Sequence, residues 1–480
     1  MRTLAALIAG GLIATAAALG TPAAHASPAA TATPQPRILN YNTMLLTVAG
    51  DWDHENRAKR IGNADFVQGN DVVVLEEVFR NQKPAAGILF DTLKNNGYTY
   101  RTPIVGATDG TRPGDNPRWN SSDNSPGSLR LENGGVVIAS KHPIDYMASR
   151  VYKVRPCGAD QHAAKGFAYV RINFHGTWLH VIGTHTQADD TNCAKGAAEE
   201  IRHKQFSEID AFIRGMHIPE SETIVLSGDM NVDRHSPEYH RMLGALHAEA
   251  PDHNLGWPYS YDTQNNTIAK YRDGRQVNFP NNPIAPTQDL DDILLRKDHA
   301  RPAVWNNKTL TGQYNWEMVS ANHHYAYSDY SDHYPVVAGD VTEPSGRYEL
   351  TVEKATLKRY NYSDNKTSYD PWDFGEITIT GASGSTRDHQ TVWTKPYKGD
   401  SYMKVGTDFP LSGLRRVRSD HGFAVHADVM DGHGGFIRNQ TVAYGTAWWH
   451  NGDPEGRQTA TLVGAYGGDI EITYTVRKMS

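Results

Sequence analysis

The stretch "TIVLSGDMN" (residues 223–231) is an apolar run that ends on an acid and an amide. Its β-branched start, followed by a Ser-Gly pair, is typical of a buried strand that stops at a turn. Asp229 and Asn231 stand two positions apart, so they would share one face if the strand continued through them. An Asx turn at Asp229 is the alternative.

A second stretch, "SDHYPVV" (residues 331–337), places Asp332 and His333 just ahead of an apolar run. One interpretation is a polar turn before an edge strand, because Pro335 cannot donate a ladder hydrogen bond. The other is a catalytic pair at the end of a sheet. The surrounding sequence decides between them.

Short Val- and Ile-rich runs alternate with amphipathic stretches around these two segments. Strands are predicted at residues 71–78, 134–140, 167–174, 178–185, 223–231 and 291–295. Helices are predicted at residues 55–66, 85–95, 197–214 and 236–246. This mixture predicts a layered α/β domain, over residues 37–341, in which helices cover a sheet.

The pattern changes after about residue 341 to strict alternation without a convincing helix. In residues 469–476, Ile470, Ile472, Tyr474 and Val476 share one face. Residues 348–354 and 375–381 alternate in the same way. Residues 348–480 are therefore predicted to form a second, all-β domain, a sandwich.

The N-terminus has the features of a secretory signal. Arg2 precedes an apolar run at residues 4–19, and Ala24-His25-Ala26 forms a small-x-small cleavage site. A membrane anchor is the alternative, but the run is short and Thr21-Pro22 interrupts it. We expect a signal peptide at 1–26, a linker at 27–36 and a secreted, extracellular, soluble protein.

Composition argues against a nucleic-acid partner. The 480 residues carry a net charge of −7, which becomes −8 once Arg2 is removed with the signal. Binders of duplex nucleic acid usually present a basic surface. We therefore expect no nucleic acid among its partners.

Cys157 and Cys193 are the two cysteines of the chain. In an exported protein such a pair predicts a disulfide bond, with two free thiols as the alternative. A loop of this size would stabilise the fold by about 3–4 kcal/mol. The spacing fits neither a redox nor a zinc motif.

Six apolar segments of the first domain each meet a side chain that carries an oxygen or an imidazole. These side chains are Asn42, Glu76 and Glu77, His185, Asp229 and Asn231, Asp291, and Asp332 with His333. Each one alone is more often a cap, a turn or a solvated acid. Together they predict one site at which strand ends converge. Its Asp, Glu, Asn and His ligands suit Mg²⁺, and the two imidazoles fit hydrolysis of a phosphoryl ester.

These residues lie in segments that also carry a family resemblance. The segments are "LNYNTMLL", "VVVLEEVFRN", "PCGADQHAAKGFAYVRI", "HVIGTHTQ", "SGDMNV", "YDTQNNTIAKY", "LDDILLRKDHARP" and "YSDYSDHYPV". Over about residues 38–340 the chain resembles the endonuclease/exonuclease/phosphatase superfamily, whose fold is a four-layer α/β sandwich of the DNase I type. Within it, the chain is similar to bacterial neutral sphingomyelinases, which are secreted, Mg²⁺-dependent phospholipases C. The second domain lies outside the resemblance.

The resemblance implies a metal side of the site. Glu77 would be the principal Mg²⁺ ligand with Asn42 beside it, because the "EVF" motif places the ligand just before Val78 and leaves Glu76 without a role. Asp229 would hold the metal from the other side, and Asp332 would complete the metal environment. Mn²⁺ or Co²⁺ are alternative cations.

The resemblance also implies the catalytic groups. His333, next to the metal, would take a proton from the attacking water, and Asp291 would orient its imidazole. Asn231 would help hold the phosphate. His185, together with Asp160, would stabilise the phosphate or assist the leaving alcohol.

Two departures from the family pattern bear on function. A second, peripheral metal site would use Asn81 and Glu132, but Asn133 stands where an acid is expected. The loop at residues 320–325, "SANHHY", lacks the aromatic tip that would enter a membrane. Trp448-Trp449 is another candidate for membrane contact, although packing in a core is the interpretation we favour.

The expected function is hydrolysis of sphingomyelin to ceramide and phosphocholine by a monomeric protein that contacts membranes peripherally. A secreted nuclease, or a sugar or inositol phosphatase, on the same fold is the enzymatic alternative. A non-catalytic lipid-binding protein is the alternative from another class.

Overall fold

The computed structural model describes residues 34–46, 52–79, 83–107, 131–274, 285–320, 323–359, 372–384, 386–396, 403–432 and 440–480. Residues 35–480 form one compact unit. The predicted signal peptide lies outside the described residues. No helix in the described part of the chain is both long enough and apolar enough to cross a membrane.

The first sheet contains the segments that open and close the mixed α/β region, residues 37–341. Its order is β10 (Asn254–Gly256), β12 (Asn306–Thr309), β15 (Val336–Gly339), β1 (Ile38–Leu45), β2 (Val72–Val78), β4 (Val137–Ser140) and β3 (Tyr100–Arg101). β1 runs parallel to β2 and antiparallel to β15. Because β15 lies between β12 and β1, the edge-strand interpretation of residues 331–337 is wrong. Pro335 stands immediately before this interior strand, where its missing N–H does not interrupt the ladder.

The second sheet contains the strand on which the sequence analysis began. Its order is β5 (Ile144–Val151), β6 (Gly166–Phe174), β7 (Thr177–His185), β8 (Thr223–Asp229), β11 (Asp291–Arg296) and β9 (Ala248–Glu249). β8 is parallel to β7 and antiparallel to β11. This register puts Asp229 level with both His185 and Asp291 at one end of the sheet.

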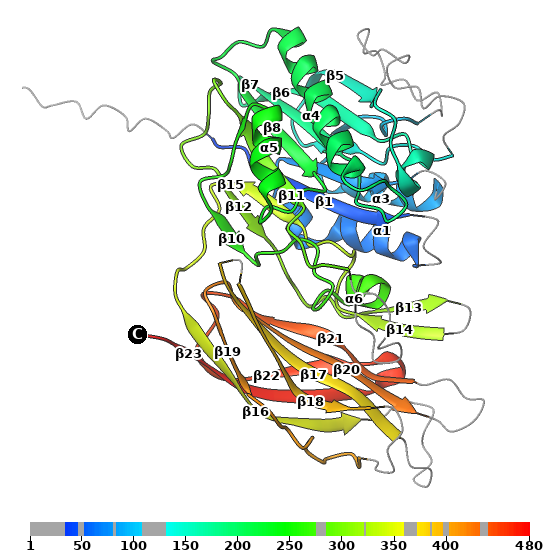
Figure 1. Ribbon diagram of the computed structural model, residues 1–480, viewed down its shortest axis with the longest axis vertical. Coiled ribbons are helices and arrows are strands. Elements are labelled where there is room, and N and C mark those ends of the chain that lie inside the picture. Colours follow the sequence, from blue (N-terminus) through cyan, green and yellow to red (C-terminus); the bar gives the residue numbers. More distant parts are fainter. Residues whose placement is uncertain are drawn as a thin grey trace, which may run out of the picture. The chain divides into compact units, whose positions relative to one another are not determined.

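The two sheets pack face to face, with helices on their outer faces (Figure 1). α1 (His54–Asn63), α2 (Asp65–Gln68) and α3 (Lys83–Asn95) cover the first sheet, and α4 (Ala197–Met216) and α5 (Pro237–Ala245) cover the second. Strands that are buried on both faces have nearly continuous apolar sequences, and for this reason they could be predicted. The predicted four-layer sandwich is confirmed.

Smaller elements lie around this sandwich. They are the 3₁₀ helix η2 (Gly158–His162), helix α6 (Thr267–Asp273), and the hairpin of β13 (Trp316–Ser320) and β14 (His323–Tyr327). α6 was not predicted as a helix, because its seven residues are too few for an apolar period to be visible. The predicted disulfide is confirmed: Cys157 and Cys193 are bonded, with their Cα atoms 5.4 Å apart. It ties η2 to the segment that follows β7.

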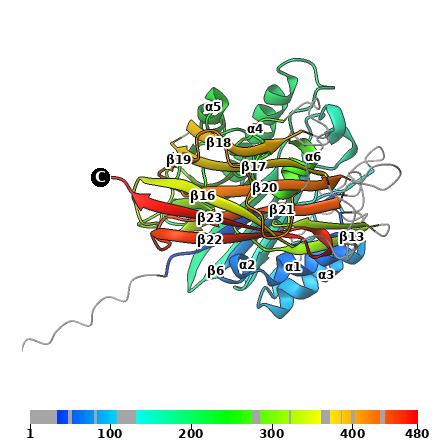
Figure 2. The same ribbon diagram turned by 90° about the horizontal axis from the view of Figure 1, so that it is seen from below.

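The C-terminal region is all-β apart from the short 3₁₀ helix η3 (Ala465–Gly467). One sheet has the order β19 (Arg416–Ser419), β16 (Tyr348–Arg359), β23 (Asp469–Lys478) and β22 (Gly456–Val463). The other has the order β18 (Thr386–Lys395), β17 (Trp372–Ser383), β20 (Phe423–Gly432) and β21 (Gln440–Trp449). The two sheets lie over one another in Figure 2 and share one apolar core. The predicted sandwich is confirmed.

The Trp448-Trp449 pair packs inward, as the core interpretation predicted. Trp449 is buried in the core of the sandwich. Trp448 is half-buried, and its ring centroid lies 4.9 Å from that of Trp257 and 5.7 Å from that of Tyr334, both in the α/β region. These contacts argue against the pair as a membrane anchor.

Candidate active site

The first contacts of the site join the two sheets. β1 turns Asn40 and Asn42 toward the inter-sheet side, where Ile38 also packs. Asn42 Nδ2 donates to Asp229 Oδ2 over 3.0 Å, and Asn40 Nδ2 donates to Asp291 Oδ1 over 3.0 Å. All four side chains are buried. The prediction that these strand ends converge is confirmed for Asn42, Asp229 and Asp291.

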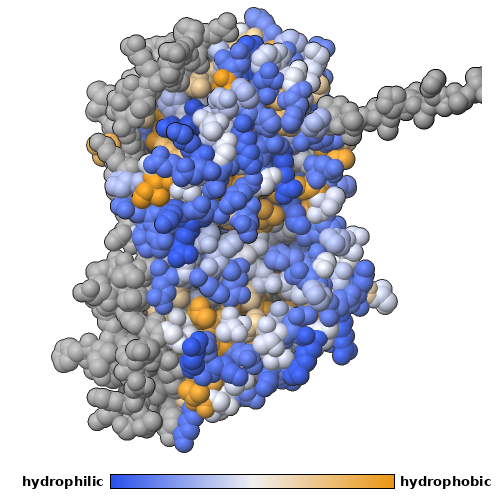
Figure 3. All heavy atoms as spheres, turned by 180° about the vertical axis from the view of Figure 1, so that it is seen from behind, coloured by the Kyte–Doolittle hydropathy of each residue, from blue (hydrophilic) through white to orange (hydrophobic). Residues whose placement is uncertain are grey.

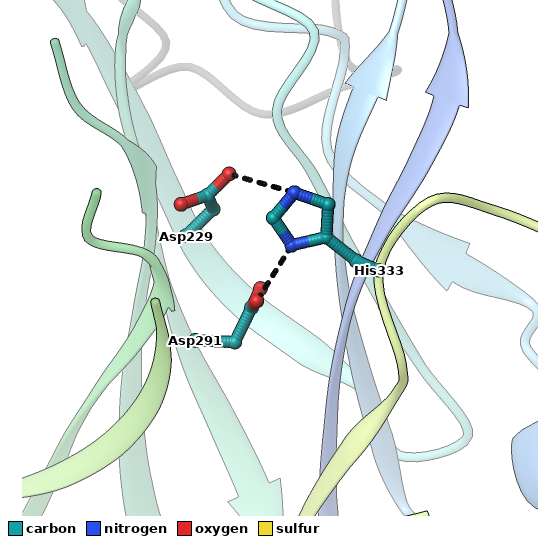
Figure 4. Close-up of side chains that lie close together, drawn as sticks. All are labelled: Asp229, Asp291 and His333. Atoms are coloured by element: carbon teal, nitrogen blue, oxygen red, sulfur yellow. Dashed lines mark hydrogen bonds and ion pairs between the residues drawn. The ribbon is translucent and has the colours of Figure 1, made fainter. Parts of the chain in front are cut away.

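His333 lies between the two aspartates (Figure 4). Its Nδ1 is 2.8 Å from Asp291 Oδ2, and its Nε2 is 3.9 Å from Asp229 Oδ2. Burial lowers the pKa of His333, but the carboxylates of Asp291, Asp229 and Asp332 outweigh this effect and raise it to about 10. The Asp291 contact fixes the imidazole with Nε2 directed into the site, as an orienting carboxylate does.

β2 brings two adjacent glutamates to the same site. Glu77 adopts a left-handed backbone with φ 54°, which interrupts the alternation of the strand. Gly135, itself at φ 71°, passes so close to it that a Cβ would lie 2.9 Å from the Glu77 Cα. Burial and the Asp332 carboxylate raise the pKa of Glu77 to about 7.

Glu76 belongs to the site, although the family resemblance assigned it no role. It is fully buried, and neither of its carboxylate oxygens has a hydrogen-bond partner among the described residues. Burial and the charges of Asp291 and Asp229 raise its pKa well above the ordinary value. It pairs with Asn42 across β1 and β2, a register that no pattern in the sequence shows.

Asp229 and Asn231 form an Asx turn, so the expectation that they share one strand face is wrong. β8 ends at Asp229, and the Asn231 N–H donates to Asp229 Oδ1 over 3.0 Å. Asn231 has a left-handed φ of 50°, and its Nδ2 donates to the Thr186 carbonyl over 3.2 Å. The turn keeps Asn231 beside the end of β7.

A lysine links the two predicted groups on the far side of the site. Lys165 Nζ donates to Asp160 Oδ2 over 2.8 Å, to His185 Nε2 over 3.0 Å and to the Thr186 carbonyl over 2.8 Å. These contacts use all three ammonium hydrogens. Lys165 is buried, and it was missed because "KGF" served only as a motif of the resemblance.

The lysine fixes the state of His185. Since an ammonium can only donate, Nε2 must accept, and the ring proton resides on Nδ1. Burial, Lys165 and His333 hold the pKa of His185 well below its ordinary value, so the imidazole is neutral. Its buried Nδ1 has no hydrogen-bond partner in the part of the chain that the structure describes. Nε2 also lies 3.4 Å from Asp229 Oδ2, so His185 stands next to the aspartate cluster.

Both carboxylate oxygens of Asp332 already have partners within the protein. Ser331 Oγ donates to Asp332 Oδ1 over 3.1 Å, and Arg272 of α6 lies 2.7 Å from Oδ2. Ser331 Oγ also bonds the Asn42 carbonyl. Although burial opposes it, Arg272 and His333 lower the pKa of Asp332. Arg272 is a second charged residue of the site that the sequence did not predict.

The donor set fits a hard divalent cation. One ligand atom from each of Asp229, Asp291 and His333 lies within 4.8 Å of the others. Asp291 and His333 already bond each other, however, so the carboxylates best suited to a cation are those with unpartnered oxygens. Within the described ranges, both carboxylate oxygens of Glu76 and Oε2 of Glu77 are buried without a hydrogen-bond partner. An isolated buried carboxylate is costly unless it is paired or metal-bound. Carboxylate and amide oxygens are the ligands that Mg²⁺ prefers.

The peripheral metal site stays a prediction. Asn81 lies outside the described residues. Glu132 is half-buried, and its Oε1 accepts from the Asn133 N–H over 2.9 Å. The side chains of residues 318–325, which include the predicted non-aromatic loop, also lie outside the description.

Comparison with known proteins identifies the family. A family model described as the Endonuclease/Exonuclease/phosphatase family matches residues 44–333. A sphingomyelinase C of Leptospira interrogans is 30% identical over 425 residues, which cover 87% of this chain and 68% of the relative.

Solved structures give the same result. The sphingomyelinase C of Streptomyces griseocarneus is 41% identical, with a TM-score of 0.56 over 64% of this chain and 99% of that one. A mutant beta toxin of Staphylococcus aureus with bound magnesium ions is 34% identical, with the same TM-score and coverage. The chain therefore belongs to the endonuclease/exonuclease/phosphatase family, in the group of the bacterial sphingomyelinases C.

Proposed function

We propose that this protein is a metal-dependent phosphodiesterase that hydrolyses sphingomyelin to ceramide and phosphocholine. The observation that carries the proposal is the buried cluster in which Asp291 orients His333 beside Asp229, Asn42 and Glu77. Relatives named sphingomyelinase C support the choice of substrate. Residues 37–341 would form the catalytic domain and residues 348–480 an accessory domain.

Glu77, Asn42 and Asp229 would hold the cation, with Glu76 and Asp332 next to them. Mg²⁺ is the ion of choice because the donors are oxygens and a related structure contains magnesium, and Mn²⁺ or Co²⁺ could replace it. When bound, the ion supplies positive charge that offsets the charge developing on the phosphate.

His333 would act as the general base toward the attacking water through Nε2. Its Nδ1 is held by Asp291, so Nε2 is the nitrogen available to the site. A base must be unprotonated, whereas the surrounding carboxylates raise the pKa of His333 to about 10. Neutralising those carboxylates would lower this pKa, which links activation of the base to occupation of the acidic cluster.

His185 and Asn231 would contact the phosphate or the leaving oxygen. The neutral His185 offers an Nδ1 proton that has no acceptor among the described residues. Lys165 and Asp160 set this tautomer, and the Asx turn orients Asn231. The disulfide bond would keep the Asp160 loop next to the segment after His185.

We propose that the protein is secreted, by the signal at residues 1–26, and acts as a monomer at membrane surfaces. On the face seen in Figure 3, apolar residues of the described chain form small, separate patches among hydrophilic ones. Such patches do not resemble a deeply inserting surface. We propose peripheral rather than embedded contact with the lipid.

The test is an assay of the purified protein on sphingomyelin, phosphatidylcholine and DNA, each with Mg²⁺ and with EDTA. We expect release of phosphocholine from sphingomyelin, abolished by EDTA and restored by excess Mg²⁺. DNA degradation without lipid cleavage would overturn the proposal in favour of the nuclease alternative. Absence of every activity under all conditions would favour a lipid-binding protein.

A further inference from the structure

The C-terminal sandwich contacts α6 of the catalytic region through buried polar groups. Lys270 of α6 forms an ion pair with Glu376 of β17, with 2.8 Å between Nζ and Oε1. The Lys270 side chain is only 4% exposed. Thr380, also on β17, donates to Asn265 Oδ1 over 3.1 Å. The Glu376 side chain is 18% exposed, and a partly buried charged pair of this kind is sensitive to the loss of either partner.

β21 supplies the other contacts to the same place. The Tyr444 hydroxyl donates to the Thr267 carbonyl over 2.6 Å, and the Thr446 hydroxyl donates to the Asn265 carbonyl over 2.5 Å. The Thr446 N–H donates to Ser328 Oγ over 3.1 Å. Between them, a Cβ on Gly445 would lie 2.7 Å from Ser328 Oγ, so the strand backbone approaches the catalytic region directly.

The N-terminus of α6 is in turn bonded to the segment that precedes the catalytic histidine. Asn266 caps the helix by accepting from the N–H groups of Ile268 and Ala269, and its Nδ2 donates to the Ser331 carbonyl over 2.9 Å. The Thr267 N–H and hydroxyl both donate to Asp329 Oδ2, over 2.8 and 2.7 Å.

The far end of α6 also reaches the site. Arg272 contacts Asp332 at 2.7 Å. The helix therefore touches the 328–333 segment from both of its ends, and the sandwich holds the helix.

We infer that the C-terminal domain positions Asp332 and His333 through α6. Lys270, Glu376, Tyr444 and Thr446 are thus positioning residues of the active site, although none of them lies in it. The inference rests on the proposed function only for its rate measurements. A domain that served lipid contact alone would not need buried, mutually satisfied bonds to α6 and Ser328.

The inference is tested in the full-length protein with a soluble phosphocholine ester of p-nitrophenol, which requires no membrane. We expect the double variant Tyr444→Phe/Thr446→Val to lower kcat about 5- to 20-fold while KM changes less than about twofold. Tyr474→Phe/Thr473→Val makes the same chemical changes on β23, in the other sheet of the sandwich, and should leave kcat unchanged. A loss confined to lipid vesicles, with kcat on the soluble ester intact, would overturn the inference.

The ion pair offers a second test by rescue. Lys270→Glu and Glu376→Lys should each lower kcat, and the combined charge swap should recover most of it. A swap no better than either single variant would contradict a role for the pair.

Amide hydrogen exchange separates this inference from the proposed substrate. Exchange in residues 328–333 should be faster in Tyr444→Phe/Thr446→Val than in the parent protein or the β23 control. This result is expected even if the parent protein cleaves no phosphocholine ester. Unchanged exchange would overturn the inference and leave the proposed function standing.

Discussion

At the scale of single residues, the site is built from charged groups that the fold holds in different protonation states. His333 lies among carboxylates that raise its pKa to about 10, whereas His185 is kept neutral by burial and Lys165. Two imidazoles with opposite shifts in one cluster suit opposite proton-transfer roles. The first two predictions concern His333 with its aspartate, and the two glutamates of β2.

The first prediction is that His333 and Asp291 act as a unit. His333→Ala should lower kcat by about 10²–10⁴-fold, the usual contribution of a general base. Asp291→Asn removes a carboxylate that raises the pKa of His333, so that pKa should fall. Since the base works unprotonated, the acid limb of the pH–kcat/KM profile should move to lower pH in Asp291→Asn. A limb that stayed in place would remove Asp291 from the orienting role.

The second prediction distinguishes the adjacent glutamates of β2. If Glu77 is the principal ligand, Glu77→Gln should weaken Mg²⁺ binding, measured by calorimetry on the protein without substrate, by at least about tenfold. Glu76→Gln keeps the shape of the buried side chain and should have a smaller effect. If Glu76→Gln weakened Mg²⁺ binding as much as Glu77→Gln or more, Glu77 would not be the principal ligand.

Some residues of the site could be predicted from the sequence because each stands at the end of an apolar strand. Asn42, Asp229 and Asp291 were found in this way. Lys165 and Arg272 were not, because a cation next to a glycine or in a short helix has no pattern of its own. Asn231 was also found, but the sequence could not show whether it continues the strand or lies in an Asx turn. Both conformations are compatible with the same residues.

At the scale of elements, the register of the strands creates the site and α6 stabilises it. β8 places Asp229 level with Asp291 on β11 and His185 on β7. Strand pairing of this kind joins residues far apart in sequence, so convergence could be expected but partners could not be assigned. Asn266 is a standard N-cap residue, and its position before "TIAK" was the available sign of α6.

The third prediction concerns the acid that binds the N-terminus of α6. Burial raises the pKa of Asp329 to about 7, although Thr267 donates two hydrogen bonds to it. In the unfolded chain an aspartate titrates near pH 4, so the folded state retains its proton to higher pH. The contribution of Asp329 to the free energy of unfolding is therefore fully present below about pH 4. It is lost as the pH rises to about 7, by roughly 4 kcal/mol.

Asp329→Asn should remove that dependence. In urea unfolding at pH 5 and pH 8, the parent protein should lose more stability between the two values than the variant does. Glu55→Gln, at an exposed acid of α1, should behave like the parent. A variant with the same loss as the parent would show that Asp329 is not the titrating group.

At the scale of the whole molecule, the sequence predicted two domains but not how they depend on each other. The domain boundary near residue 341 was visible because the spacing of apolar residues changes there, from a mixture of helical and strand periods to strict alternation. That spacing can be followed along the sequence itself. The interface was not visible, since Lys270, Glu376, Tyr444 and Thr446 have no common spacing and meet only in the folded chain. Packing of the Trp448-Trp449 pair was favoured from the sequence, but the contact of Trp448 with Trp257 in the other domain was not predicted.

The last prediction is that the two domains unfold together. Apolar contacts of Trp448 and buried polar bonds to α6 make the interface resemble the interior of a domain, so separating the halves would expose unpaired groups. Calorimetry of the full-length protein should give one transition whose calorimetric and van't Hoff enthalpies agree.

Lys270→Glu places two acids opposite each other at Glu376 and should split the transition in two. In this variant, addition of Mg²⁺ should raise the transition temperature of the catalytic domain alone, because a ligand stabilises only the unit that binds it. Two transitions in the parent protein would mean that the domains are energetically independent, and the positioning of Asp332 and His333 would then have to come from the catalytic domain alone.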